Sequence, residues 1–354
     1  MFNKLKVIEL ASVLAGPAVG SFFAELGAEV IKVENKLSGG DMTRNWKLSS
    51  EDPNARVSAY FSSVNYHKTY LEKDLSKERD QEEIHSLIES ADIVIVNFKK
   101  DSAKKLKMDY QSLSALNPAL IYASIEGFSS DPEKVAFDMV LQAETGFMSM
   151  NGFPDQDPAK LPVAFIDLFA AHQLKEGILI ALLNRKEDGK GCHVSVSLEE
   201  AALASLANQA SNYLMEGKIP QRLGSLHPNI APYGEVISTR DGKKYVLAVG
   251  TDKQFRSLCE VVDSAYLSED HRFSTNPSRV SNRISLQKLL ASLFNKMSSE
   301  EFEESCKKRM IPIGEIKDLQ QVLESPIAQT MILKESIDGV ETSRLKSIAF
   351  KFSG

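Results

Sequence analysis

Asp167 is the residue of this chain whose type and setting most clearly suggest chemistry. It stands alone in an apolar run, with residues 163–166 before it and residues 168–171 after it. A carboxylate is costly to bury among apolar side chains unless it is hydrogen-bonded, paired with a cation or used in a reaction. An Asp at the start of a helix often accepts hydrogen bonds from the first backbone N–H groups, so Asp167 is either a helix cap or a nucleophile.

A second candidate site is the glycine-containing stretch near the N-terminus. Gly16 and Gly20 fall between an expected strand and an expected helix, and Glu34 ends the next expected strand. The full G-x-G-x-x-G pattern is absent and Pro17 stands within the turn, so a close approach of the backbone to a pyrophosphate is not secured. This stretch is therefore weak evidence for a nicotinamide site.

Alternating strands and helices position these residues. In the first part of the chain, short β-branched runs such as KVIEL, EVIKVE and DIVIVNF alternate with helical stretches. This alternation predicts an α/β fold, in which a large domain over residues 1–220 contains an open, mostly parallel, Rossmann-like sheet. After the loop LGSLHPNIAPYG we expect a smaller α+β domain over residues 221–325, with a hairpin turn at Asp241-Gly242.

The composition narrows the class of protein. The chain has 354 residues and a net charge of -6, which argues against nucleic acid as a partner. Cys192, Cys259 and Cys306 have no CxxC spacing, so we expect neither a metal site nor disulfides. There is no signal-type segment and no run of eighteen apolar residues, so we expect a cytoplasmic protein that does not enter a membrane.

Several motifs, taken in order, resemble the class III coenzyme A transferases. This family includes formyl-CoA and carnitine CoA-transferases and the related 2-methylacyl-CoA racemases. The matching residues are the string VLAGPAVGSFFAELGAEVIKVE, GGDMTR at 39–44, NYHK at 65–68, VNF at 96–98 and the lone Asp167. The resemblance is specific from about Lys6 to Lys190 and looser beyond. Because Asp167 falls where these transferases keep their nucleophilic aspartate, the resemblance favours catalysis over a cap.

The resemblance also implies a coenzyme A site. The residues that it assigns to this site are Val13, Leu14, Ala15, Lys36, Lys73, Asp74, Leu75, Asn97, Phe98, Lys99 and Lys105. Residues 13–15 match the turn at the thioester end, and residues 73–75 match a stretch near the adenine. Lys105 replaces a phosphate-binding Arg, which keeps the charge but loses the bidentate geometry. The alternative for the lysines of residues 99–107 is a solvated helix face.

The residue before Asp138 distinguishes two branches of the family. The racemases carry a His-Asp pair where this chain has Phe137-Asp138, and a phenyl ring cannot move a proton. We therefore expect acyl transfer, with Asp138 orienting the acyl end. A racemase, in which His172 or another group replaces the missing base, and a non-catalytic CoA-binding protein are the alternatives.

Family resemblance implies the reaction and the assembly. Coenzyme A moves from an acyl-CoA donor to a carboxylic acid through an aspartyl anhydride and an aspartyl-CoA thioester, with no cofactor beyond coenzyme A itself. The functional unit is an interlocked homodimer, and the C-terminal segment 326–354 returns to the large domain. The chain lacks the tetraglycine run that covers the site in the formyl-CoA branch. The donor and acceptor acids do not follow from the sequence.

Overall fold

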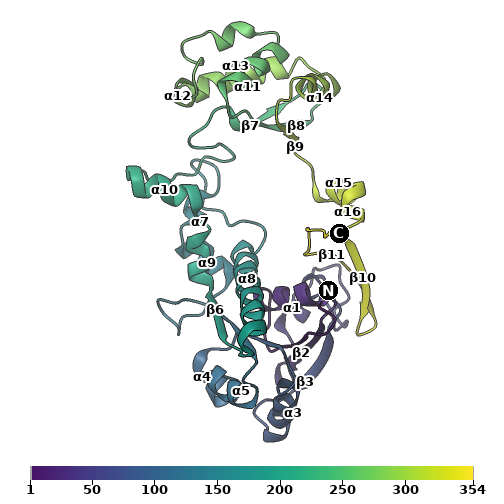
Figure 1. Ribbon diagram of the computed structural model, residues 1–354. Coiled ribbons are helices and arrows are strands. Elements are labelled where there is room, and N and C mark those ends of the chain that lie inside the picture. The colour runs from purple at the N-terminus through teal and green to yellow at the C-terminus, as the bar shows by residue number, and fades with distance from the viewer. Residues whose placement is uncertain (1, 354) are drawn as a thin grey trace. The chain divides into compact units, whose positions relative to one another are not determined.

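The computed structural model describes residues 2–353, which divide into two compact units (Figure 1). The first unit runs to Phe147 and includes Lys160–Lys218 and the chain from Pro326 onward. The second unit comprises Met148–Ala159 and Ile219–Ser325. Residues 148–159, which the sequence analysis assigned to the large domain, join the second unit, where the N–H of Gly224 donates to Gly152 O at 2.8 Å.

A six-stranded sheet of the order β3-β2-β1-β4-β5-β6 is the centre of the first unit. Every neighbouring pair is parallel, which confirms the predicted α/β fold. The strand order reverses between β1 and β4, and ligands of open parallel sheets bind outside the carboxyl ends of the strands at such a point. The strands are β1 (Lys6–Glu9), β2 (Glu29–Asn35), β3 (Thr69–Lys73), β4 (Ile93–Val96), β5 (Ile121–Glu126) and β6 (His193–Ser197).

Helices cover both faces of this sheet (Figure 1). On one face α1 (Ala15–Glu25) and α8 (Phe165–Asp188) pack against each other and against the sheet. On the other face the apolar sides of α3 (Glu78–Ile88) and α5 (Tyr110–Leu116) join a second core cluster. Strand residues alternate between the two clusters, so Val7 faces α1 while Ile8 faces α3.

The remaining elements of the first unit are short, apart from the C-terminal hairpin. They are η1 (Lys36–Ser38), η2 (Met42–Asn45), α2 (Ala59–Ser62), α4 (Lys100–Lys105), α6 (Asp138–Glu144), α9 (Leu198–Ala204), α10 (Ala207–Glu216), α16 (Pro326–Gln329), β10 (Ile332–Ile337) and β11 (Val340–Leu345). The helix α7 (Phe147–Met150) lies where the two units meet along the chain.

The C-terminal hairpin β10–β11 packs on α2, where Ile337 joins Val57 and Phe61 in a small apolar cluster. The sequence analysis considered an extended segment at SIAFKFSG, but residues 346–353 form no strand and the hairpin precedes them. Arg344 forms a buried ion pair with Glu25. The chain end therefore contributes to the first unit.

The second unit builds its own core from a three-stranded antiparallel sheet and helices. The predicted hairpin forms around Gly242, whose φ of +83° suits a tight turn. The elements are β7 (Tyr233–Ser238), β8 (Lys244–Ala248), β9 (Ile313–Glu315), α11 (Asp252–Val261), η3 (Ala265–Ser268), α12 (Asn276–Ser281), α13 (Arg283–Phe294), α14 (Ser299–Lys308) and α15 (Leu319–Leu323). Across residues 2–353, none of the helices has the length and apolar character that a membrane crossing requires.

Candidate active site

Asp167 is the third residue of α8 and is only 8% exposed. Ala164 occupies the N-cap position, and the free backbone N–H groups of Ile166 and Asp167 donate to the side chain of Asp138 and not to that of Asp167. The helix-cap alternative for Asp167 is therefore wrong. The apolar neighbours Ile166 and Ala170 are fully buried, so the carboxylate lies at the edge of the core that α8 forms with α1.

The surroundings of Asp167 disfavour its charge. Burial raises the pKa of this carboxyl to about 7, and the nearby negative charge of Asp138 adds to the effect. Near neutral pH both protonation states are therefore populated. The ionised form is poorly solvated, and a carboxylate that lacks water around it is a better nucleophile.

Asp138 is the first residue of α6, and its carboxylate fixes the start of α8. It accepts hydrogen bonds from the backbone N–H of Ile166 at 2.8 Å and of Asp167 at 3.4 Å, and a third from Gln142 Nε2 at 2.6 Å. We predicted that Asp138 orients the acyl end of the substrate. In the structure its hydrogen bonds are to the helix that carries Asp167 and to Gln142.

Tyr60, which the sequence analysis missed, has a hydroxyl that is influenced by the charge of Asp167. Burial raises the pKa of its hydroxyl, and the charges of Asp167, Asp138 and Asp41 raise it further, in that order. The hydroxyl thus stays protonated and is available as a hydrogen-bond donor. The ring of Trp46 packs edge-on against Tyr60, with the ring centroids 4.9 Å apart. Trp46 and Tyr60, which lie between the GGDMTR and NYHK motifs, were the available signal.

A cavity of about 360 Å³ opens at the carboxyl ends of β1, β2, β3 and β4, beside the point where the strand order reverses. Four of the residues predicted for the coenzyme A site line it, namely Lys73, Asp74, Leu75 and Phe98. Other lining residues come from the ends of β1 and β2 and from the GGDMTR segment. The structure thus brings segments far apart in the sequence to one edge of the sheet.

The other predicted cations do not line this cavity. Lys36 is exposed and lies between the lining residues Asn35 and Leu37. Lys105 is exposed at the end of α4, next to the lining residue Leu106. The ammonium group of Lys99 donates to the carbonyl of Glu133 at 2.6 Å.

The predicted Asn97 makes its hydrogen bonds to the backbone. Its Oδ1 accepts from the N–H of Ser12 at 3.2 Å, and its Nδ2 donates to Ser12 O at 2.9 Å. Val13, the next residue, has a φ of +73°, while Leu14 and Ala15 are buried at the start of α1. Asn97 therefore secures the turn in which Val13, Leu14 and Ala15 lie.

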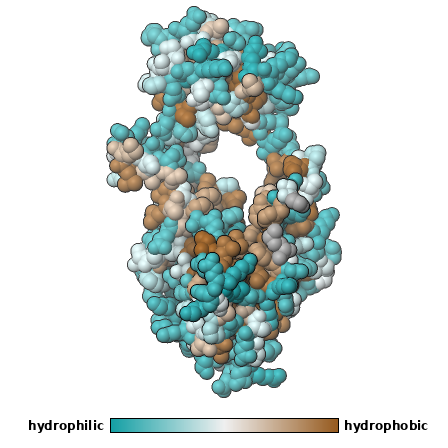
Figure 2. Space-filling model, in the orientation of Figure 1, coloured by the Kyte–Doolittle hydropathy of each residue, from teal (hydrophilic) through white to brown (hydrophobic). Residues whose placement is uncertain are grey.

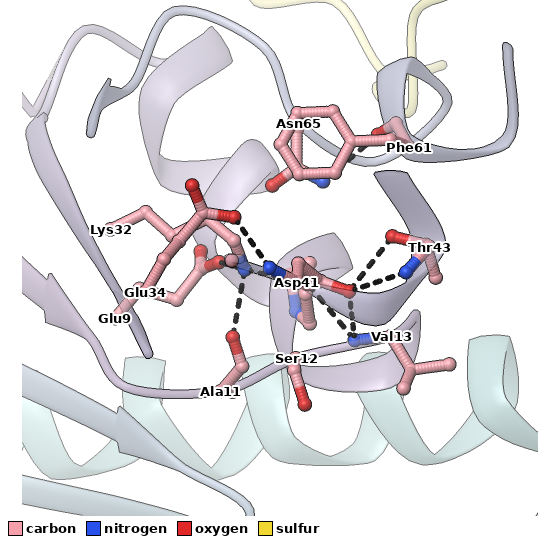
Figure 3. A network of polar contacts seen from close by, with 12 residues as sticks. Glu9, Ala11, Ser12, Val13, Lys32, Glu34, Asp41, Thr43, Phe61 and Asn65 are labelled. Atoms are coloured by element: carbon pink, nitrogen blue, oxygen red, sulfur yellow. Dashed lines mark hydrogen bonds and ion pairs between the residues drawn. The ribbon is translucent and has the colours of Figure 1, made fainter. Parts of the chain in front are cut away.

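A buried cluster of charges supports the same turn (Figure 3). The ammonium group of Lys32 lies 2.9 Å from Glu9 Oε1 and 3.1 Å from Asp41 Oδ2, and Lys68 pairs with the other oxygen of Glu9 at 2.8 Å. Burial opposes the charge of Lys32, but Glu9 and Asp41 outweigh it and raise its pKa. Burial lowers the pKa of Lys68 to about 8 despite its partner Glu9.

The cluster also explains Gly20. A Cβ added to Gly20 would lie 1.8 Å from Glu9 Oε2, so only glycine lets α1 pass this close to the carboxylate. Gly16 is similar, because its Cβ would lie 2.3 Å from that of Ala11. These glycines serve the packing of α1 on β1. Charged residues inside the apolar runs KVIEL and EVIKVE were the signal for the cluster, which the sequence analysis did not use.

The chain was compared with protein families, curated proteins and solved structures. The family model described as CoA-transferase family III matches residues 2–354. A succinate–glutarate CoA-transferase of Agrobacterium fabrum is 38% identical over 340 residues, which cover 94% of this chain and 84% of that protein. An acetyl-CoA:oxalate CoA-transferase of Acetobacter aceti is 32% identical, with 94% and 85% covered. The crystal structure of a CAIB/BAIF family protein from Brucella suis has a TM-score of 0.82 and 38% identity, with 98% and 91% covered.

Proposed function

The chain belongs to family III of the CoA-transferases, and from this premise we propose that it moves coenzyme A between acids with Asp167 as the nucleophile. The observation that carries the proposal is a single carboxylate, 8% exposed, whose pKa is raised to about 7 at the start of a buried helix. The carboxylate of Asp138 accepts hydrogen bonds from two backbone N–H groups at that helix start. Nucleophilic carboxylates of this kind form covalent intermediates with acyl groups.

The proposed reaction proceeds through two covalent states. A carboxylate oxygen of Asp167 attacks the carbonyl carbon of the donor thioester, the C–S bond breaks, and the coenzyme A thiolate leaves a mixed anhydride. The thiolate then attacks the aspartyl carbonyl, releases the donor acid and forms an aspartyl-CoA thioester. The acceptor carboxylate displaces the thiolate, and the thiolate attacks the new anhydride at the acceptor acyl carbon, which regenerates Asp167.

The hydrogen bonds around Asp167 restrict which groups stabilise the oxyanions of these steps. The N–H groups of Ile166 and Asp167 already donate to Asp138. The protonated hydroxyl of Tyr60 is a nearby donor, and we infer that it contributes to this stabilisation.

The cavity at the edge of the sheet is the proposed coenzyme A site. Its lining includes Lys73 and Phe98, and a phosphate-bearing adenine nucleotide needs a cation and an apolar or aromatic surface. The exposed side chains of Lys36 and Lys105 adjoin the lining and are proposed as further phosphate contacts. Lys99 is proposed to join them when the ligand replaces its bond to Glu133.

We propose a short dicarboxylic acid as donor or acceptor. The names of two relatives specify succinate with glutarate and acetyl-CoA with oxalate. A mass-spectrometric screen of acyl-CoA donors against a panel of mono- and dicarboxylates tests the substrate class. Transfer only to branched monocarboxylates would contradict it. Phe137 at the N-cap of α6 offers no proton, so nothing in the site favours the racemase alternative.

Replacing Asp167 by Ala is the direct test of the mechanism. We expect transfer to fall by roughly 10³-fold or more, because the covalent route is lost, while coenzyme A still binds. Glu187→Gln, an exposed carboxylate on the same helix, is the control and should leave transfer unchanged. Trapping with donor and hydroxylamine should label the peptide that contains Asp167. A loss of only a few-fold would contradict the assignment.

We further propose that the enzyme is a cytoplasmic homodimer. The helix α10 supports the second part, because Leu214 and Met215 are 79% and 80% exposed and, of its described residues, none is buried. Figure 2 shows hydrophobic atoms at the place of this helix. Apolar side chains gathered on one helix are typical of an interface. Light scattering coupled to size-exclusion chromatography should give twice the chain mass, and a monomer would contradict the proposal.

A further inference from the structure

The turn between β1 and α1 is held by three side chains from different parts of the first unit, the buried Lys32 and Asp41 and the half-buried Asn97. The backbone of each of the three consecutive residues 11–13 forms a hydrogen bond with one of these side chains. The pairs are Lys32 Nζ with Ala11 O at 2.8 Å, Asn97 with the backbone of Ser12 at 2.9 and 3.2 Å, and the Asp41 carboxylate with the N–H of Val13 at 3.1 and 3.3 Å. Figure 3 shows Asp41 between Val13 and Lys32.

Val13 is the strained member of this turn. Its φ of +73° lies in the left-handed region, which a β-branched residue rarely adopts. Such a conformation persists only where the surroundings impose it, and strained residues cluster at functional sites. The side-chain contact to the backbone of Val13 comes from the carboxylate of Asp41, which accepts from its N–H at 3.1 and 3.3 Å.

Asp41 is itself fixed before any ligand binds. The residue is 4% exposed, and its carboxylate also accepts from the N–H of Thr43 at 3.1 Å and from its hydroxyl at 2.8 Å. The ion pair with Lys32 and the bond from its own N–H to Glu34 complete the environment. Its carboxylate is thus bonded to the protein, although the residue also lines the cavity, and we assign its role to the contact with Val13.

The turn and the start of α8 belong to the same core cluster. Val13 packs in the same core cluster as Tyr60 and Ile166, the neighbour of Asp167. The hydroxyl of Tyr60 is influenced by the charges of both Asp167 and Asp41. The helix that follows the turn, α1, packs along α8, which carries Asp167. A displacement of the turn therefore changes the surface beside the nucleophile.

We propose that Asp41 is a positioning residue for CoA transfer, which holds Val13 in the left-handed conformation and so fixes the backbone that presents the donor thioester to Asp167. This inference rests on the proposed function. The cavity residues at the ends of β3 and β4 bind the nucleotide end of the donor, and the turn, whose Ala11 and Ser12 form another part of the cavity lining, places the thioester. A misplacement of about 1 Å in a reacting geometry is enough to slow a reaction by about 10²-fold.

Asp41→Asn tests the proposal, since it keeps the shape and removes the charge. We expect the rate of single-turnover donor cleavage to fall between about 10-fold and 10²-fold, while the Kd for free coenzyme A changes by less than about 3-fold. The matched control is Glu25→Gln, which breaks a buried ion pair with Arg344 at the far end of α1. The control should keep the wild-type cleavage rate.

A second substitution separates positioning from general stability. Glycine adopts a positive φ without strain, so Val13→Gly introduced into Asp41→Asn should recover part of the lost cleavage rate. The same substitution in the wild-type background should give no gain. Hydrogen exchange at the peptide that contains Val13 should speed up in Asp41→Asn and not in Glu25→Gln.

The outcomes distinguish this inference from the proposed function. If the wild type transfers no coenzyme A between any acids, the proposed function fails. Independently of that result, unchanged hydrogen exchange at Val13 in Asp41→Asn would show that Asp41 does not fix the conformation of Val13. If the wild type is active and Asp41→Asn cleaves donor as fast as Glu25→Gln, the positioning role is wrong. If Asp41→Asn does not fold, Thr43→Val replaces it, because it removes one hydrogen bond to the Asp41 carboxylate. Its rate of donor cleavage must then fall, by less than is expected for Asp41→Asn, while its Kd for coenzyme A stays unchanged.

Discussion

The charge of Asp167 should lower the stability of the folded protein. Because its pKa is raised from 3.8 to about 7, the folded state binds more protons than the unfolded chain between these pH values. With respect to this group, the folded state is therefore most stable below pH 3.8, where Asp167 is protonated. That stability is lost as the pH rises toward 7 and the buried carboxyl ionises. Asp167→Asn removes the penalty, and we expect it to be more stable than the wild type by on the order of 3 kcal/mol at pH 8.

The fluorescence of Trp46, the single tryptophan of the chain, reports this unfolding from the first unit. The advantage of Asp167→Asn should shrink as the pH falls toward 4. An equal gain in unfolding free energy at pH 4 and pH 8 would mean that a change in packing, and not the loss of the charge, stabilises Asp167→Asn.

Asp138 contributes to the raised pKa of Asp167 through its own charge. Asp138→Asn keeps an oxygen that accepts from the N–H of Ile166 but removes the negative charge. The rate of single-turnover donor cleavage should rise with pH as Asp167 ionises, and its midpoint should move to lower pH in this variant. The move should be smaller than the whole elevation, because burial is the larger cause. An unmoved midpoint in a folded variant would contradict the coupling.

For single residues, the sequence identifies those that are unusual among their neighbours. Asp167 was recognisable because it is the one charge in an apolar run, and the run itself predicts its burial. The bonds of Asn97 to Ser12 and of Asp41 to Val13 were not predictable in the same way, since they join segments 85 and 28 residues apart. Only the fold brings these partners together.

The packing of α1 on β1 depends on Gly20. Glycine within a helix is normally less favourable than alanine by about 1 kcal/mol, so Gly20→Ala should be stabilising on helix propensity alone. The close approach to Glu9 reverses this expectation, and we predict a loss of about 2 kcal/mol or more. Denaturant unfolding followed at Trp46 measures it. A variant as stable as the wild type would show that the carboxylate moves away freely.

Lys105 at the end of α4 has a separate role in the proposal. Lys105→Ala should raise the KM for the donor thioester with little change in kcat, because a phosphate contact is formed equally in the ground and transition states. The effect should shrink as salt rises. Lys104→Ala, an exposed neighbour on the same helix, is the control. Equal effects of the two substitutions would support a solvated helix face without a specific contact.

Elements with a clear periodic pattern were predictable, and elements defined by distant partners were not. The alternation of β-branched runs and helices predicted the parallel sheet, because each run has its pattern locally. The hairpin β10–β11 had a local signal that the sequence analysis did not use, the Asp338-Gly339 pair between its strands, where both residues have a positive φ. Its packing on α2, which lies far away in the sequence, had no local signal. The membership of residues 148–159 in the second unit also depends on contacts beyond any local window.

The C-terminal hairpin of the first unit forms ion pairs with residues near the N-terminus. Arg44, 3% exposed, pairs with Glu34 at 2.7 Å and with Asp338 at the tip of the hairpin at 2.9 Å. Asp338→Ala leaves part of this buried guanidinium unpaired, and we expect a loss of about 1–3 kcal/mol in the unfolding free energy of the first unit. Glu341→Ala, an exposed position of the same hairpin, is the control. Equal stability of the two variants would contradict the role of the pair.

The same pairing constrains how the protein is made. Arg44 and Asp338 are 294 residues apart, and Glu25 and Arg344 are 319 residues apart. On the ribosome, the second unit is complete once residue 325 has emerged, whereas the first unit also needs the hairpin over residues 332–345. Until the hairpin packs, the guanidinium of Arg44 lacks Asp338, and the apolar surface of α2 lacks Ile337. The nascent chain therefore carries Asp167 on an unfinished unit until the hairpin β10–β11 has emerged.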